Sequence, residues 1–291
     1  MGAPGPPGLD RGLVIAGDNL EVLSGLPDGC ADLVYIDPPF NTGQTRSHTR
    51  LRTVADAGGD RTGFGGRRYR SVPVGTSAYL DVFDDWLGFL APRLAELHRL
   101  LAIHGSLYLH VDWRESHYAK VLGDAVFGRD NFLNEVVWAY DYGGRTRRRW
   151  PPKHDVLLVW VRDRRRYFFD SGEVERIPYM APALAGATKA ARGKLPTDTW
   201  WHTIVPTAGP ERTGYPTQKP LGVLRRVVAA SCVPGGVVLD AFAGSGTAGA
   251  AALELGRRFI LVDSNPAALR VMRRRLGASA GVRFLPEDAG I

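Results

Sequence analysis

The chain has 291 residues, 44% of them hydrophobic and 23% charged, and a formal net charge of +7. These values are typical of a globular protein and exclude a disordered or fibrous one. No apolar run is long enough to cross a membrane. The presence of only two cysteines argues against a disulfide framework and fits a reducing cytoplasm.

Short apolar runs alternate with helical patterns along most of the chain, and this alternation predicts an α/β fold with a mostly parallel sheet. Seven strands are predicted, at residues 12–16, 31–36, 106–111, 135–140, 156–161, 237–241 and 259–262. Five helices are predicted, at residues 86–101, 114–127, 221–232, 246–255 and 266–276. The Gly- and Pro-rich residues 1–11 are expected to form a disordered tail.

Two stretches break this alternation. Residues 41–80 are rich in Gly, Arg and Thr and hold seven Arg against two Asp, which predicts a mobile basic insertion. Residues 163–214 contain an Arg run and several prolines, which predicts a small insertion on one edge of the sheet. A second basic segment, residues 145–166, holds eight Arg and one Lys against two Asp. Each basic segment alone also fits a solvated loop, whereas the two together favour a surface that binds phosphates.

The motif Asp37-Pro-Pro-Phe40 stands where the predicted strand 31–36 ends. Two consecutive prolines cannot donate backbone hydrogen bonds, and each favours an extended residue before it. The resulting stiff turn combines carbonyl oxygens, a carboxylate and an aromatic face. Such a turn suits a planar group bearing an NH2, because the oxygens accept its hydrogens while Phe40 stacks on its ring. Four residues alone also fit an ordinary turn.

A second motif, Asp240-Ala-Phe-Ala-Gly-Ser-Gly-Thr247, closes another predicted strand and opens a helix. Its glycines let a ligand approach the backbone closely, and the helix N-terminus offers unpaired N–H groups. Asp263 ends the next strand, where a carboxylate can accept hydrogen bonds from ribose hydroxyls. From spacing alone, a dinucleotide site and a methyl-donor site remain close to even.

A cluster of His110, Asp112 and His117 could suggest a metal site. Solvated or core-satisfied side chains are the favoured interpretation, because no Cys/His spacing resembles a known metal motif. No metal is therefore predicted.

The two motifs, together with Glu211-Arg-Thr-Gly-Tyr-Pro-Thr-Gln-Lys-Pro220, resemble the bacterial DNA amino-methyltransferases. The catalytic tetrapeptide precedes the donor loop, an order similar to that of the circularly permuted beta group. The resemblance extends from Gly12 to about Leu276, and Ala241 departs from the usual Pro. It implies a Rossmann-like methyltransferase fold in which the strand before Asp240 lies beside the strand before Asp37.

The resemblance also assigns residues to roles, with S-adenosyl-L-methionine as the methyl donor. The catalytic turn is Asp37, Pro38, Pro39 and Phe40. The donor's adenine is expected near Asp18 and Asn19, its ribose at Asp263, and its methionine part at Phe242 and the Gly244–Thr247 loop. Thr217 and Lys219 are expected beside the methionine part, with Lys219 neutralising its carboxylate. The donor-binding set is Asp18, Asn19, Thr217, Lys219, Asp240, Phe242, Gly244, Ser245, Gly246, Thr247 and Asp263.

The implied reaction is direct transfer of the methyl group to the N6 amine of an adenine flipped out of double-stranded DNA. Cytosine-N4 methylation is the runner-up, and an RNA or protein methyltransferase and an inactive DNA-binding module are further alternatives. The implied organisation is a catalytic half at 12–162, a target-recognition insertion at 163–214 and a donor-binding half at 215–291. Expected DNA contacts are Arg67, Arg68, Arg145, Arg147, Arg148 and Arg149.

The expected setting is the bacterial cytoplasm, in association with the nucleoid and without a membrane partner. The sequence leaves open whether the protein is a homodimer and whether a cognate restriction endonuclease accompanies it.

Overall fold

The computed structural model describes residues 2–40, 44–55, 58, 61–62, 68–81, 83–144, 146–206 and 208–288. It contains two compact units. The main unit comprises Met1–Phe40 and Asp85–Ile291, and the hairpin unit comprises Asn41–Asp84. Within the described residues, no helix is both long enough and apolar enough to span a lipid bilayer.

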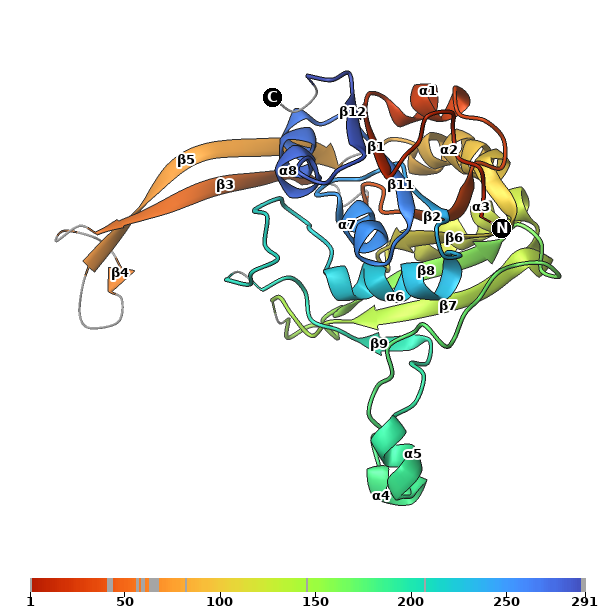
Figure 1. Cartoon of the computed structure of the whole chain (residues 1–291). Coiled ribbons are helices and arrows are strands. Elements are labelled where there is room, and N and C mark those ends of the chain that lie inside the picture. The colour runs from red at the N-terminus through yellow and green to blue at the C-terminus, as the bar shows by residue number, and fades with distance from the viewer. Residues whose placement is uncertain are drawn as a thin grey trace. The chain divides into compact units, whose positions relative to one another are not determined.

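The main unit is built on a nine-stranded sheet of order β12-β1-β11-β10-β2-β6-β8-β7-β9 in the described part of the chain (Figure 1). All seven predicted strands are present, and the short strands β9 and β12 widen the sheet at its two edges. These two were missed because each has only three or four residues and half-exposed positions. The strands are β1 (Gly12–Ala16), β2 (Ala31–Ile36), β6 (Leu101–Val111), β7 (Phe132–Ala139), β8 (His154–Val161), β9 (Thr199–Trp201), β10 (Val237–Asp240), β11 (Arg258–Asp263) and β12 (Val282–Leu285).

Neighbouring strands run parallel from β12 to β6, and the sheet then turns antiparallel where β6 pairs with β8 and β8 with β7. Strand β10 pairs directly with β2, with Val238 opposite Leu33. Because parallel strands end at the same edge of a sheet, the two predicted motifs come together there. The predicted α/β fold with a mostly parallel sheet is confirmed.

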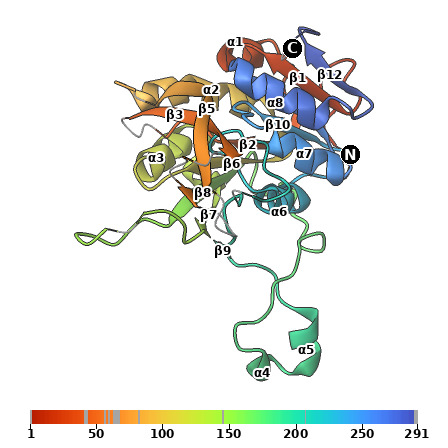
Figure 2. The same cartoon turned by 90° about the vertical axis from the view of Figure 1, so that its left-hand side faces the viewer.

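Helices pack on the sheet in two groups, α1 to α3 and α6 to α8, and Figure 2 shows the sheet between them. Four of the five predicted helices match to within one residue at each end, and α3 begins two residues later than expected. Helix α1 was missed because it is only six residues long; its N-cap is Asp18. The helices are α1 (Asn19–Ser24), α2 (Trp86–Leu100), α3 (Ser116–Phe127), α4 (Pro182–Ala185), α5 (Ala187–Arg192), α6 (Leu221–Ser231), α7 (Thr247–Glu254) and α8 (Pro266–Leu276).

The predicted insertion 163–214 contains a small lobe that projects from the main unit in both views (Figures 1 and 2). It holds α4 and α5, and a bridge between Ile177 and Lys194 joins the two sides of its stem. Met180 and Leu184 are almost fully exposed on the lobe. The segment returns to the sheet through the edge strand β9, which runs parallel to β7.

The hairpin unit contains strands that the sequence analysis did not predict within residues 41–80, and the mobility of this insertion stays a prediction. Strand β3 (Gln44–Ala55) pairs antiparallel with β5 (Arg68–Asp81), and β4 (Arg61–Thr62) adds a short third strand. Thr, Val and Tyr recur along β3 and β5, and these residues favour strands. The interspersed Arg and Gly obscured that pattern in the sequence.

The N-terminal segment also differs from the predicted disordered tail. Ala3 is buried, and its backbone N–H donates to both Asp32 carboxylate oxygens at 2.8 and 3.0 Å. The same carboxylate accepts from the Val237 backbone N–H at 2.7 Å and lies 2.6 Å from His104 Nε2. Asp32 is completely buried, so one side chain ties the N-terminal segment to β2, β6 and β10.

Replacing Asp32 should test this tie. In Asp32→Asn an NH2 group replaces one acceptor oxygen, which leaves buried N–H donors without a partner. We therefore expect the free energy of unfolding to fall by about 3 kcal/mol. Urea denaturation measures this change. Asp130→Asn, which alters an exposed carboxylate, is the matched control and should stay within about 0.5 kcal/mol of the unsubstituted protein. Equal midpoints for the two variants would contradict the assigned role.

Candidate active site

The catalytic turn begins where β2 ends, as predicted. The Pro39 carbonyl accepts a hydrogen bond from Trp86 Nε1 at 2.6 Å, which fixes the turn against the first residue of α2. The Asp37 side chain is 18% exposed, and its Oδ1 atom is buried without a hydrogen-bond partner among the described residues. A buried, charged acceptor without a donor is costly, so this oxygen is suited to receive one from a ligand.

Lys219 contacts the catalytic turn directly. Its Nζ donates to Asp37 Oδ2 and lies 4.9 Å from the centre of the Phe40 ring. The ammonium is therefore held by both a carboxylate and an aromatic face. The contact with Asp37 was not foreseen, and the predicted role of Lys219 at the donor's carboxylate stays a prediction.

A buried polar network lies behind Asp37. His110 on β6 is fully buried, with Nδ1 2.7 Å from the Tyr35 hydroxyl, Nε2 3.2 Å from Asp155 Oδ2 and Nδ1 3.9 Å from Asp37 Oδ1. Its ring also packs on Phe40, with centres 5.7 Å apart. Burial raises the pKa of Asp155, but hydrogen bonds with His110 and Tyr140 and the nearby charge of Lys219 outweigh burial, so the pKa lies below its usual value.

The donor loop follows β10 and is tied to the end of β11. Asp263 Oδ2 accepts from the Gly244 N–H at 2.7 Å, and Asp240 Oδ1 accepts from the Phe242 N–H at 3.0 Å. Gly244 adopts φ +50° and Gly246 φ +73°, values that favour glycine. Burial raises the pKa of Asp240 well above its usual range, and the nearby charge of Asp37 acts in the same direction.

Hydrogen bonds connect the donor loop to the segment that carries Lys219. Thr247 Oγ1 donates to the Lys219 carbonyl at 3.2 Å and lies 3.0 Å from Ser245 Oγ. Arg275 Nη1 on α8 donates to Thr247 Oγ1 at 3.1 Å. The backbone at Lys219 is thus fixed to the donor loop, while its side chain reaches the catalytic turn. Thr217 precedes it with φ +59°, a strained turn for a non-glycine residue.

The predicted adenine-binding pair takes part in internal contacts. Asn19 Nδ2 donates to the Ala241 carbonyl at 2.8 Å, and Asn19 Oδ1 accepts from Arg93 Nε at 2.6 Å. Asp18 caps α1 and pairs with Arg93 at 3.3 Å. These contacts hold α1 and α2 against the start of the donor loop, and a role for either residue at the donor's adenine stays a prediction.

The first part of the basic segment 145–166 lies on the loop between β7 and β8, and its remainder covers β8 and the residues that follow it. Arg147, Arg148 and Arg149 are exposed, and the Arg149 guanidinium lies 5.2 Å from the centre of the Trp113 ring. Arg68 of the hairpin unit is also exposed, whereas Arg67 and Arg145 fall outside the described residues.

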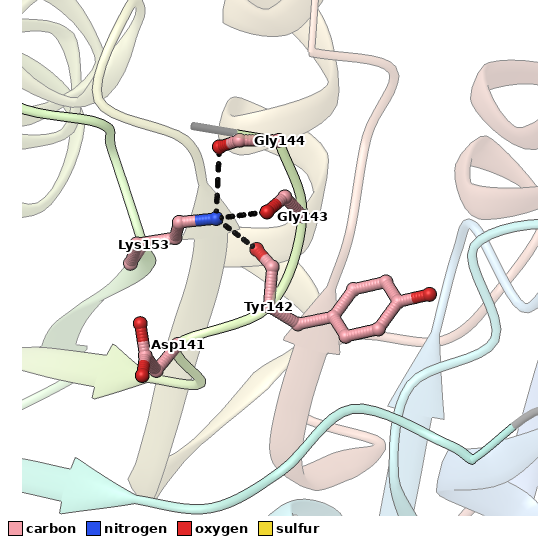
Figure 3. Close-up of a pocket in the computed structure, with 5 residues that line it drawn as sticks. All are labelled: Asp141, Tyr142, Gly143, Gly144 and Lys153. Carbon is pink, nitrogen blue, oxygen red and sulfur yellow. Dashed lines mark hydrogen bonds between the residues drawn. The ribbon is translucent and has the colours of Figure 1, made fainter. Parts of the chain in front are cut away.

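At the root of this loop, a hollow of about 440 Å³ is lined by residues 141–144 and Lys153 (Figure 3). Lys153 Nζ donates to the carbonyls of Tyr142, Gly143 and Gly144 at 2.6 to 3.0 Å (Figure 3). Three carbonyls around one ammonium give the loop a defined turn, so Lys153 has a structural role here.

The site contains three residues that the sequence analysis did not place in it, namely Tyr35, His110 and Asp155. The sequence analysis left His110 as either a solvated or a core side chain; it is fully buried, and its contacts with Asp37 and Phe40 were not foreseen. The available signal was positional: His110 lies one residue before the end of β6, next to the strand that carries Asp37.

A family model described as DNA methylase matches residues 31–274. The chain is 27% identical over 286 residues to the DNA adenine methyltransferase YhdJ of Escherichia coli K12, covering 94% of this chain and 85% of that protein. Its fold is similar to that of the M1.HpyAVI–SAM complex, with a TM-score of 0.58, 18% identity and coverage of 91% and 98%. It is also similar to that of the cytosine-N4-specific PvuII DNA methyltransferase, with a TM-score of 0.62, 13% identity and coverage of 96% and 92%.

The packing of Gly246 gives a testable prediction. A Cβ atom there would lie 2.8 Å from Met272 Cγ, so a side chain would press into the core rather than toward a ligand. With the left-handed φ added, we expect Gly246→Ala to lower the free energy of unfolding by about 1 to 3 kcal/mol. Thermal denaturation measures the loss. Gly144→Ala, at a position with open space around Cβ, is the control, and equal melting temperatures would contradict the packing argument.

Proposed function

The chain belongs to the N4/N6 DNA methylase family, and we propose that it transfers a methyl group from S-adenosylmethionine to the N6 amine of adenine in double-stranded DNA. The observation that carries this proposal is the buried Asp37 Oδ1, which has no hydrogen-bond donor among the described residues and belongs to the same turn as Phe40. An exocyclic amine supplies the missing N–H, and its ring suits the aromatic face.

The residues around Asp37 suit a flipped base. A base amine inside a duplex is stacked and paired, so it reaches a buried carboxylate only after extrusion. Asp37 Oδ1 and the Pro38 carbonyl would accept the two amine hydrogens. This arrangement directs the nitrogen lone pair away from the ring and toward the donor, which is a gain of position and electrostatics.

The donor loop suits S-adenosylmethionine, which supplies an electrophilic methyl group when bound. The positive φ values of Gly244 and Gly246 set the turn of the loop between β10 and α7, and Asp263 holds the loop in place while retaining acceptor capacity for ribose hydroxyls. Phe242 and the residues from Gly244 to Thr247 would hold the methionine part. Donor and base would meet because β10 and β2 are neighbours.

Adenine is favoured over cytosine-N4 because the catalytic turn opens with Asp and because YhdJ is named an adenine methyltransferase. Duplexes that contain only A·T or only G·C pairs are incubated with S-adenosylmethionine labelled in its methyl group, and the nucleosides are then separated by chromatography. Label recovered as N6-methyladenine supports the proposal. Label recovered as N4-methylcytosine would move the function to the runner-up, and label in RNA or protein alone would refute it.

The proposal includes two DNA-contacting regions. Exposed arginines between β7 and β8 would bind phosphates, and segment 163–214, which includes the α4–α5 lobe, would contact bases and select the site. Catalytic and donor-binding halves would flank that segment at 12–162 and 215–291. The protein would act in the cytoplasm on nucleoid DNA, and neither a second subunit nor a cognate restriction endonuclease is required for the chemistry.

Asp37→Asn tests the catalytic role. The substitution keeps the volume but removes the charge and one acceptor, so the rate of methyl transfer should fall on the order of a hundredfold or more. Donor affinity, measured by calorimetry with S-adenosylhomocysteine, should change little because Asp37 is expected to contact the base. Asp28→Asn, on an exposed carboxylate, serves as the control. Near-normal turnover by Asp37→Asn would eliminate the assignment.

A charge reversal tests the phosphate contacts. The double variant Arg147→Glu/Arg148→Glu should weaken DNA binding for all sequences and reduce the slope of log affinity against log salt concentration. Arg270→Glu/Arg274→Glu makes the same charge change at exposed positions of α8, outside the segments proposed to contact DNA. Fluorescence anisotropy across a salt series measures both, and identical salt slopes would place the DNA elsewhere.

A further inference from the structure

His110 is a buried, titratable side chain that takes no part in the methyl transfer proposed above. Its Nδ1 atom is 3.9 Å from Asp37 Oδ1, the oxygen that has no hydrogen-bond partner among the described residues. Its ring packs on that of Phe40. On its far side, Nε2 is 3.2 Å from Asp155, and the Trp138 ring packs edge-on at 5.5 Å. A histidine needed only for packing would not require a buried carboxylate behind it and a second one in front.

The hydrogen bonds define which nitrogen carries the proton. Burial, together with the nearby Asp37, raises the pKa of Tyr35 well above its ordinary value, so the hydroxyl keeps its hydrogen and can donate to His110 Nδ1. An unprotonated Nε2 would face the Asp155 carboxylate lone pair to lone pair. The tautomer that satisfies both contacts carries its hydrogen on Nε2, and Nδ1, the nitrogen on the Asp37 side, is then the acceptor.

We propose that His110 is a positioning residue of the methyl-transfer site: it aligns Asp37 and Phe40 and takes from Asp37 the proton that the methylated amine releases. The inference rests on the proposed function. Asp155 supports it by keeping a negative charge beside Nε2, as a carboxylate does behind a histidine that acts as a base. The charged and titratable groups that face His110, directly or through Asp155 and Asp37, are Tyr35, Asp37, Tyr140, Asp155 and Lys219.

The proton balance shows why such a group is useful. The amine nitrogen forms a bond to the methyl carbon, and the methyl–sulfur bond breaks with its electron pair remaining on sulfur. The nitrogen then carries a positive charge and releases one hydrogen as a proton to Asp37 Oδ1. His110 Nδ1 takes this proton from Asp37 while the Tyr35 hydroxyl rotates to become an acceptor. Asp37 returns to the carboxylate form, and Asp155 stabilises the imidazolium.

Lys219 explains why Asp37 needs a second group for this purpose. Its ammonium donates to Asp37 Oδ2, so this oxygen already has a partner. The other oxygen, Oδ1, faces His110 and is the one left for the base amine. The Asp37 carboxylate thus lies between the Lys219 cation and the His110 ring.

The experiment compares His110→Gln and Asp155→Asn with the unsubstituted protein. Glutamine can still donate to Asp155 but provides no basic nitrogen, and asparagine keeps the size of Asp155 without its charge. We expect kcat to fall on the order of a hundredfold in the first variant and about tenfold in the second. KM for DNA, donor affinity by calorimetry and extrusion of 2-aminopurine at the target site should each stay within about threefold. His98→Gln, a half-buried histidine on α2 that packs on Phe127, is the matched control.

A merely structural role would give different results. If His110→Gln retained the kcat of the unsubstituted protein, or if it lost DNA and donor binding as strongly as kcat, the proposal would be overturned. His110→Ala adds a second test, because imidazole should restore part of its kcat and pyrazole, which is equally large but far less basic, should not. Equal rescue by both would also overturn it. Absence of methyl transfer by the unsubstituted protein would instead refute the proposed function.

Discussion

The parallel pairing of β2 with β10 is the constraint on which the rest of the site depends. The two strands are some two hundred residues apart in sequence, yet they lie side by side, with Leu33 opposite Val238. Asp32 reinforces the pairing by accepting a hydrogen bond from Val237 at 2.7 Å. The catalytic turn and the donor loop extend from the same edge of the sheet because of this pairing. The order of the motifs along the chain is therefore immaterial to the chemistry, since position in the sheet determines which groups meet.

Electrostatic compensation is the second theme of the site. Several carboxylates gather near the ends of β2, β8, β10 and β11, where burial would ordinarily favour their neutral forms. The structure compensates selectively: Lys219 faces Asp37 and His110 faces Asp155, whereas the pKa of Asp240 is raised. The two compensated carboxylates, Asp37 and Asp155, flank His110. Asp37, which is expected to contact the base amine, thus has a cationic partner, whereas burial raises the pKa of Asp240 at the start of the donor loop.

The main unit could be predicted from the sequence because its signals are local. Apolar runs mark β2 and β10, and turn-forming residues follow each of them, so the two motifs and their common edge were foreseeable. The partner of Lys219 was not, because a long flexible side chain can reach either the donor or Asp37 and only the fold decides. Asp155 approaches His110 through the antiparallel pairing of β6 with β8, a long-range register that no local pattern specifies. In the hairpin unit, the strands were not foreseen because arginines interrupt a pattern of strand-forming residues.

The hydrogen bond from Trp86 to the Pro39 carbonyl closes a loop in the chain. The hairpin unit leaves the main unit after Phe40 and returns at Asp85, so its two ends are clamped together beside the catalytic turn. Once the ends are clamped, the closure entropy depends only weakly on how many residues lie between them. Residues can therefore be added to this segment or removed from it at little cost in the free energy of folding, while the catalytic turn in the main unit keeps its geometry.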